Sequence, residues 1–417
     1  MKKKCLNILL GSGIHSGFLD SVGDLTKLIL DYSPEYIGLN EQLDNNIINF
    51  RKFINIIHNE IKVFFKGYLI KPTYEDIIYL LLQFKEHNDG FKFNPAFDYF
   101  YKNVLIQYGF SELDINKKNI YSEVNKAFFS SSHHSNLLEA IYRFISERLN
   151  ISSAKQNGII KNIDPLTILT KSIYQIDSSE LNIFSLNHDT VFEDSFIQNN
   201  IKYNDGFSSG LSCKPNSYTN GIKFDVKSFN SYSNINLLKL HGSVNWFYNN
   251  YNRELINIDA PIELFEPYIY KLTNGVSYPY NDLAIIAGIY NKLELYTTSS
   301  FFDLFCLFKQ KLYNSNHLVI SGYGFMDKGI NNFISEWLLK DADNKILLIH
   351  PDINQLTNKS IKNITLKETF IYRNYQTFLD KNKLFVLDSK FSGLKTDSVF
   401  KSANKEIQLN DVININN

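Results

Sequence analysis

Five short apolar runs recur along the chain, and each is followed at once by glycine or polar residues. They span residues 6–10, 181–186, 237–240, 318–321 and 345–349. Runs that are apolar at nearly every position are typical of strands in a parallel sheet that is covered on both faces. Apolar residues at helical spacing fill the gaps between them, for instance over residues 190–198 and 330–339. The pattern predicts an α/β fold, a Rossmann-like doubly wound parallel sheet.

A different pattern occupies the stretch between the first and second runs. Over residues 45–66 and 74–84, Ile, Phe and Leu recur at helical intervals, and Gly and Pro are scarce. We interpret residues 41–159 as a large helical insertion and residues 1–40 with 160–390 as one discontinuous domain. Glu75 and Asp76 within the insertion either face the site or lie on a solvated helix face, and we favour the solvated face. Residues 391–417 are expected to form a polar C-terminal tail that is loosely packed from about residue 401.

Composition narrows the class of protein. The 43 basic and 43 acidic residues give no net charge, which argues against strong direct binding of nucleic acid through its phosphates. With 44% hydrophobic residues, the chain can bury a large core and is not mainly disordered. The run at residues 6–10 is too short for an export signal, and no apolar stretch approaches the roughly 18 residues that cross a bilayer. We expect a cytoplasmic protein without membrane contact.

The cysteines exclude two kinds of site. Cys5, Cys213 and Cys306 lie far apart, and no two of them form a Cys-x-x-Cys pair. A disulfide framework and a four-cysteine zinc site are therefore both excluded. We expect no zinc.

The residues that follow the apolar runs are the candidates for chemistry, because the carboxyl ends of parallel strands bind ligands in this fold class. The first candidate is residues 11–17, Gly-Ser-Gly-Ile-His-Ser-Gly. Closely spaced glycines let a pyrophosphate approach bare backbone N–H groups. The spacing is one residue longer than the usual dinucleotide fingerprint, so a plain tight turn is the alternative interpretation.

Two further candidates follow the second and third runs. In Ser-Leu-Asn-His-Asp-Thr, residues 185–190, Asn187 and Asp189 either meet a ligand or satisfy the turn itself. Thr190 and Glu193 have the spacing of a capping box that would begin the next helix. His241, in Lys-Leu-His-Gly-Ser-Val-Asn-Trp, has an imidazole suited to general base catalysis near neutral pH, although a lone histidine is often structural.

The last two candidates follow the fourth and fifth runs. In Ser-Gly-Tyr-Gly-Phe-Met-Asp, residues 321–327, Gly322 and Gly324 permit close approach to a ligand, and Asp327 is suited to cap the next helix. Asp352 is placed to reach a ribose hydroxyl. A glycine turn and a simple turn are the respective alternatives.

Taken in order, the motifs that begin at Gly11, Ser185, Lys239 and Ile320 resemble those of the sirtuin-like superfamily. The branch they resemble most is the bacterial sirtuin-like domains of anti-phage defence systems, and the resemblance covers residues 4–20 and 181–352. It implies a domain that binds NAD. By the same resemblance, Asn187 would position the attacking water beside the nicotinamide ribose, and His241 would be the catalytic histidine.

The resemblance also implies binding roles for further residues. Gly11, Ser12 and Gly13 would hold the pyrophosphate, and Asp189 would support the pocket. Gly322, Tyr323 and Asp352 would line the adenosine side. Two departures bear on the reaction: the four-cysteine zinc module of the deacylases is absent, and so is their Pro-Asp-Phe-Arg run after the glycine-rich loop.

Both departures favour water over an acyl-lysine as the acceptor. The resemblance then implies an NAD glycohydrolase that forms ADP-ribose and nicotinamide and depletes NAD during anti-phage defence. The alternatives are a catalytically quiet module that senses NAD or ADP-ribose and, less favoured, a protein deacylase; NADP as substrate stays open. An activating partner is expected, with a HerA-type ATPase or a short Argonaute as family precedents, and so is a homo-oligomer.

Overall fold

The computed structural model describes most of the sheet, the helices that cover it and much of the insertion. The described residues are 5–15, 19–31, 50–64, 72–88, 100, 102–104, 106–107, 131–150, 180–207, 222–229, 233–248, 254–257, 269–271, 277–279, 282–286, 299–325, 327–351, 374–390, 394, 397–409 and 412. Asp352 and Cys213 lie outside them. Within them, no helix combines the length and the apolar character that crossing a membrane requires.

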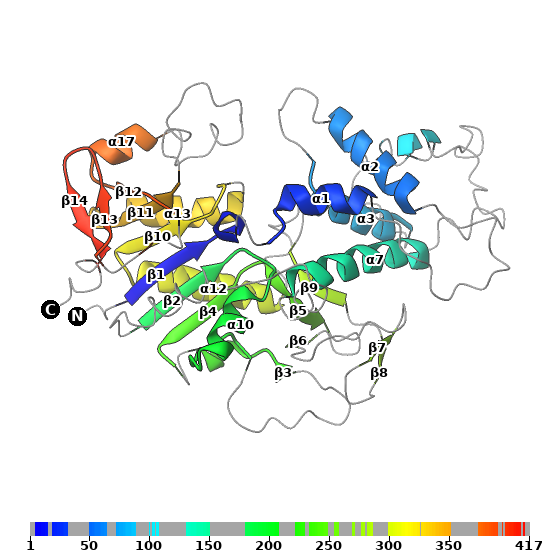
Figure 1. Cartoon of the computed structure of the whole chain (residues 1–417), viewed down its shortest axis with the longest axis horizontal. Coiled ribbons are helices and arrows are strands. Elements are labelled where there is room, and N and C mark those ends of the chain that lie inside the picture. Colours follow the sequence, from blue (N-terminus) through cyan, green and yellow to red (C-terminus); the bar gives the residue numbers. More distant parts are fainter. Residues whose placement is uncertain are drawn as a thin grey trace.

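An eight-stranded sheet forms the centre of the molecule, in the order β14-β13-β12-β11-β10-β1-β2-β4 (Figure 1). The six strands from β12 to β4 are parallel, and β13 and β14 are antiparallel. The strands are β1 (Cys5–Leu10), β2 (Glu180–Ser185), β4 (Ile235–Lys239), β10 (His317–Ser321), β11 (Lys345–His350), β12 (Leu384–Asp388), β13 (Val399–Lys401) and β14 (Glu406–Gln408). The predicted α/β class, with its parallel sheet, is confirmed, and all five apolar runs form strands.

The order of the strands creates a switch point beside β1. The chain runs from β1 to β2 and β4 on one side, then crosses to β10, β11 and β12 on the other. Loops after β1 and β10 therefore leave the sheet in opposite directions. In open α/β sheets this is the place where ligands bind.

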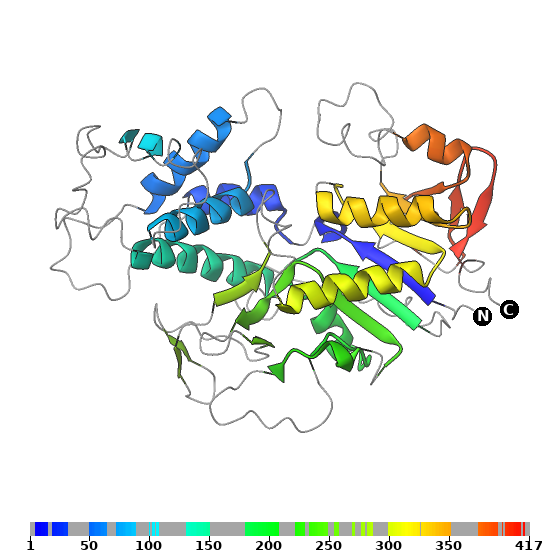
Figure 2. The same cartoon turned by 180° about the vertical axis from the view of Figure 1, so that it is seen from behind.

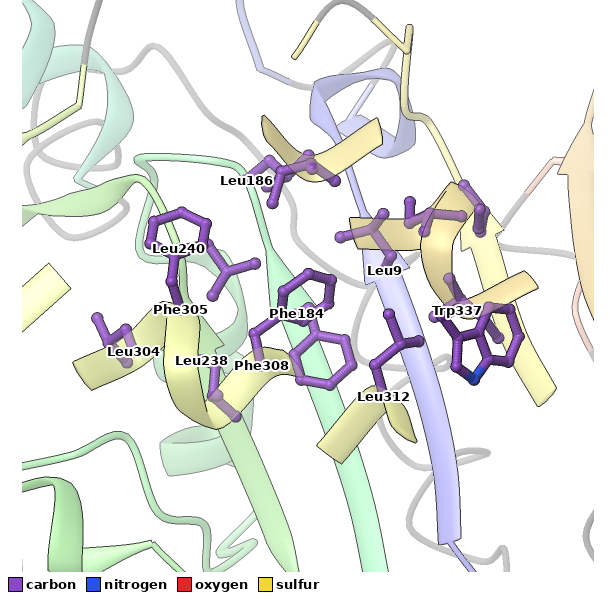
Figure 3. Close-up of a cluster of buried hydrophobic side chains, with 14 of the residues drawn as sticks. Leu9, Phe184, Leu186, Leu238, Leu240, Leu304, Phe305, Phe308, Leu312 and Trp337 are labelled. Atoms are coloured by element: carbon purple, nitrogen blue, oxygen red, sulfur yellow. The ribbon is translucent and has the colours of Figure 1, made fainter. Parts of the chain in front are cut away.

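Helices cover both faces of this sheet, which explains why most positions of its parallel strands are apolar. Side chains of α10 (Val191–Gln198) pack on one face. The other face is covered by α12 (Ser299–Tyr313), α13 (Lys328–Lys340) and α17 (Tyr375–Asp380). Figure 2 shows α12 and α13 in front of the strands. In Figure 3, Leu9, Phe184 and Leu238 of three adjacent strands meet Phe308 and Leu312 of α12.

The insertion packs as a separate helical layer against a small second sheet. Its helices are α2 (Phe50–Phe64), α3 (Tyr74–Asn88) and α7 (Ser131–Leu149), which share one apolar cluster with α1 (Val22–Asp31). The helices expected over residues 45–66 and 74–84 are thus present, and Figure 1 shows the group at the end of the molecule opposite β14. The domain boundaries stay predictions.

The small sheet has the order β3-β6-β5-β9. Val244 and Phe247 of this sheet join the apolar cluster of the insertion. The short elements are β3 (Ile222–Lys223), β5 (Gly242–Tyr248), β6 (Leu255–Asn257), β7 (Ile269–Lys271), β8 (Ser277–Pro279), β9 (Asp282–Ile285), and the 3-10 turns η1 (Ser12–His15) and η3 (Val226–Ser228).

The expectation of a loosely packed tail is wrong for the residues that the structure describes there. Strands β13 and β14 extend the main sheet beside β12, and Phe400, Leu409 and Val412 are buried in the apolar cluster on the face that α10 covers. The polar composition of the segment concealed this, because a few apolar side chains suffice to anchor an edge hairpin.

Candidate active site

Four of the five candidate segments line one cavity of about 310 Å³ at the carboxyl ends of the parallel strands. The strand ends are level with one another. Leu10 of β1 lies opposite Ser321 of β10 and Ser185 of β2, and Ser185 lies opposite Lys239 of β4. Residues that directly follow these positions therefore reach the same edge, as the sequence predicted.

Glycines bring the loops after β1 and β10 into direct contact at the switch point. A Cβ atom on Gly11 would lie 2.5 Å from the carbonyl oxygen of Gly322, whose φ of +65° also favours glycine. The N–H groups of Gly11 and Gly13 donate to the carbonyl oxygens of Ser321 and Gly322, both at 3.0 Å. These two N–H groups thus join the loops, so any contact with a pyrophosphate there would use other groups.

The predicted ligand residues are distributed unevenly around the cavity. Gly11, Ser12, Gly322 and Tyr323 line it, and Gly13 is not among the lining residues. Asp352 lies outside the described residues. Binding of pyrophosphate or adenosine by any of them stays a prediction.

Asn187 is the most unusual polar residue of the cavity. Its side chain lines the cavity and is 6% exposed, and neither Nδ2 nor Oδ1 has a hydrogen-bond partner among the described residues. Its backbone N–H donates to Ser185 Oγ at 3.2 Å. A buried amide without partners costs about 1–3 kcal/mol, and such groups in native proteins call for an explanation such as a catalytic role.

His241 pairs with a carboxylate across the cavity. Its Nε2 lies 2.9 Å from Asp327 Oδ2, and both side chains are buried. The other carboxylate oxygen, Oδ1, accepts the N–H of Ile330 at 3.1 Å and begins α13, as the sequence predicted for Asp327. The helix terminus therefore fixes Asp327, and Asp327 in turn fixes one ring nitrogen of His241.

A second histidine–carboxylate pair lies on the same cavity. His15 Nδ1 is 3.0 Å from Asp189 Oδ2, and both residues are buried. Burial by itself would raise the pKa of Asp189, but His15, Lys239 and the N–H of Val191 together lower it. Asp189 is therefore ionised at neutral pH and carries a negative charge into the cavity.

The predicted capping box at the start of α10 is wrong. Thr190 occupies the N-cap position, but its side chain makes no capping hydrogen bond. Its hydroxyl instead donates to Asp194 Oδ2 at 2.6 Å, and Glu193 turns inward to pair with Lys239 at 2.9 Å. Asp189 supplies the cap in its place, by accepting the N–H of Val191 at 3.1 Å.

The helical insertion supplies one wall of the cavity, which the sequence did not predict. Tyr74 and Glu75 at the start of α3 line it, and so does Leu149 at the end of α7. Asp76, expected on a solvated face, is 3% exposed and accepts the N–H of Thr73 at 2.8 Å. The direction in which a helix turns a given side chain depends on its packing, and the spacing of residues did not reveal it.

Apart from histidines, the charged side chains that line the cavity are acidic, and one of them, Asp20, pairs with Arg148 at 2.6 Å. Asp20, Glu75, Asp189 and Asp327 line the cavity, and neither Lys nor Arg occurs among the described lining residues. Across the described residues, no group of three or more His, Cys, Asp or Glu side chains is placed to hold a metal ion. The cavity is thus suited to a ligand that carries or develops positive charge at its reacting end.

Sequence reasoning missed His15 and the pairing of Asp327 with His241, and for Glu75 it favoured a solvated helix face over the cavity that this residue lines. His15 lies within the glycine-rich loop, and an imidazole next to the expected phosphate site could have marked it as a candidate. The pairing of His241 with Asp327 joins residues far apart in the chain, and no local pattern carries it.

Residues 181–372 match the family model described as SIR2-like domain. The match covers somewhat less than half of the chain and includes Asn187, His241 and Asp327, and it supports the sirtuin-like superfamily. SIR2-like domains generally use NAD, so an NAD-related function is supported as well. No curated protein matches the chain.

Proposed function

We propose that this protein is an NAD glycohydrolase that cleaves NAD into ADP-ribose and nicotinamide. One observation carries the proposal: the buried amide of Asn187 faces the cavity without a protein partner among the described residues. In strand order it stands between the glycine loops after β10 and β1 on one side and His241 after β4 on the other, and His241 pairs with Asp327 of the loop after β10. A ligand that spans these groups would supply the partner that the amide lacks.

The residues present fit a dinucleotide in that position. Glycines pack closely at the switch point beside β1, where nucleotides bind in open α/β sheets. The acidic wall of the cavity suits the positively charged nicotinamide ring of NAD.

The proposed reaction breaks the bond between the ribose C1′ and the nicotinamide nitrogen and forms a bond between C1′ and a water oxygen. Asn187 orients the water through its amide, and His241 accepts the proton that the water gives up. Asp327 stabilises the charge that His241 gains. Asp189 and Asp327 also provide a negative field for the positive charge that develops on the ribose in the transition state.

The proposed biological role follows the resemblance of the motifs. The protein would deplete NAD in an infected bacterial cell, and a second protein, such as a HerA-type ATPase or a short Argonaute, would activate it. Such control is needed because an unrestrained NAD hydrolase harms its own host. We also propose a homo-oligomer; light scattering that shows a monomer at micromolar concentration would count against it.

Two single variants separate an enzyme from a quiet NAD sensor. Asn187→Ala is the cleaner of the two, because its side-chain amide has no hydrogen bond to a described residue that the change would break. We expect it to abolish turnover without lowering the melting temperature. His241→Ala is also expected to abolish turnover, but it deprives buried Asp327 of its imidazole partner and so costs stability.

Chromatography of nicotinamide release, with calorimetry of NAD binding, provides the test. Retained NAD binding with lost turnover in Asn187→Ala supports the enzyme. A wild-type protein that binds NAD and releases no nicotinamide, alone or with extract of phage-infected cells, would show a sensor instead.

A further inference from the structure

A fully buried lysine lies beneath the cavity. Lys239 is the last residue of β4, two positions before His241, and it is 1% exposed. Lysine is almost never buried to this extent unless its charge is paired and its three donors are satisfied. The residues around Lys239 therefore show what its charge is used for.

The ammonium group of Lys239 joins three separate segments. Its Nζ donates to the backbone carbonyl of Asp189, to Glu193 Oε1 at 2.9 Å and to Ser243 Oγ at 2.8 Å. These acceptors belong to the loop after β2, to the first turn of α10 and to the start of β5. All three donors of the ammonium group thus have an acceptor.

These contacts bind together the two loops that carry the proposed reaction. Asn187 lies two residues before Asp189, and His241 lies between Lys239 and Ser243 in the chain. Two further bonds join the same loops: the N–H of Val244 and the hydroxyl of Ser243 donate to the carbonyl of His188 at 2.9 and 3.3 Å. The Lys239 ammonium contacts both loops and α10 at once.

The position of Asn187 depends on this arrangement. Its side-chain amide has no partner among the described residues, so side-chain hydrogen bonds within that part of the chain do not fix it. Its backbone fixes it instead, and the backbone of that loop is held at Asp189. Small displacements of reacting groups cost large factors in rate, about 100-fold for 1 Å.

We propose that Lys239 is a positioning residue, whose buried ammonium holds the Asn187 loop and the His241 loop at the separation that the reaction requires. This inference rests on the proposed function. The competing explanation is that Lys239 only neutralises Glu193 in the core.

A double variant separates the two explanations. In Lys239→Met with Glu193→Leu, both charges are replaced by apolar side chains of similar size, so no unpaired charge is left in the interior. If Lys239 only neutralised Glu193, the double variant would keep both the stability and the turnover of the wild type. If Lys239 positions the loops, the double variant keeps its stability but loses turnover, because the carbonyl of Asp189 and the hydroxyl of Ser243 have lost their donor.

We expect the double variant to fold and to release nicotinamide at least about tenfold more slowly than the wild type. Hydrogen exchange is measured on the same samples. Protection is expected to fall about tenfold or more in peptides 186–190 and 240–245 and to stay unchanged in the core strand at residues 345–350. Glu193→Gln is the matched control, because it leaves the Lys239 donors to Asp189 and Ser243 in place and should keep most of the turnover.

The outcomes separate this inference from the proposed function. Unchanged protection of the backbone amides in both peptides, or wild-type turnover in a stable double variant, would overturn the role of Lys239. Protection lost evenly over the whole chain would also overturn it, since the lysine would then be a general core residue. If protection falls locally while the wild type shows no turnover, the proposed hydrolase fails and the role of Lys239 in holding the loops stands.

Discussion

At the scale of single residues, Asp327 has two tasks that one substitution separates. Its Oδ1 caps α13, and its Oδ2 pairs with His241. Asparagine is as good an N-cap as aspartate but carries no charge. We expect Asp327→Asn to keep the stability of the helix and to lower kcat about 100-fold or more, because His241 loses the carboxylate that stabilises its charged form.

Steady-state kinetics and thermal unfolding of Asp327→Asn check this together. Asp327→Ala is the comparison, since it removes the cap as well and should lower the melting temperature. Equal kcat values for Asp327→Asn and the wild type would show that the carboxylate has no part in the reaction.

A second residue-scale prediction concerns pH. Burial, together with the charge of Lys345, lowers the pKa of His317 from its ordinary 6.5 to about 4. As pH falls from 6.5 to 4, His317 binds a proton in the unfolded chain but stays largely neutral in the folded protein. The free energy of unfolding therefore decreases by about 3 kcal/mol. His317→Gln should lose this part of the acid sensitivity. Urea unfolding at pH 7 and pH 4.5 measures it, and equal losses in both proteins would contradict it.

At the scale of elements, a line of buried asparagines crosses three strands. Asn7, Asn182 and Asn236 lie opposite one another on β1, β2 and β4 and are joined side chain to side chain at 2.9 and 2.8 Å. At the two ends of the line, Asn7 donates to the carbonyl of Lys311, and Asn204 donates to Asn236. A shift of one residue between these strands would break every one of these bonds, so the line fixes the register of the site.

Removing the central asparagine tests this directly. Asn182→Leu leaves partners on both sides unsatisfied, and we expect the free energy of unfolding to fall by about 2–4 kcal/mol. Asn404→Leu, at an exposed position, is the control and should change stability by less than about 0.5 kcal/mol. Equal effects of the two changes in urea unfolding would contradict the account.

Five of the eight strands of the main sheet were predictable from the sequence, because burial on both faces demands nearly continuous apolar runs, whereas β12, β13 and β14 were not predicted. The asparagine line was also visible, as Leu-Asn-Ile, Leu-Asn-Ile and Ile-Asn-Leu in three successive strands. Strand β5 was not predicted, because residues 239–246 were interpreted as a polar segment that ends the preceding strand. The buried role of Lys239 was not predictable either, since it needs partners from three elements that only the folded chain brings together.

At the scale of the whole molecule, the cavity is shared between the main sheet and the helical insertion. Glu75 of α3 lines it opposite the strand ends. Glu75→Lys reverses a charge on the acidic wall, and we expect kcat/KM for NAD to fall about tenfold because positive charge develops in the transition state. Glu60→Lys on α2 is the matched control, since Glu60 is not among the lining residues. Equal kcat/KM values for the two variants would show that the charge of Glu75 on the insertion has no part in the reaction.

The central claim is that the Asn187–His241 cavity hydrolyses NAD. Chromatography of purified protein with NAD, alone and with extract of phage-infected cells, tests it most directly, with Asn187→Ala beside the wild type. We predict equal amounts of nicotinamide and ADP-ribose from the wild type in at least one condition and none from Asn187→Ala. NAD that stays intact in both conditions, or that is lost equally with the variant, would contradict the claim.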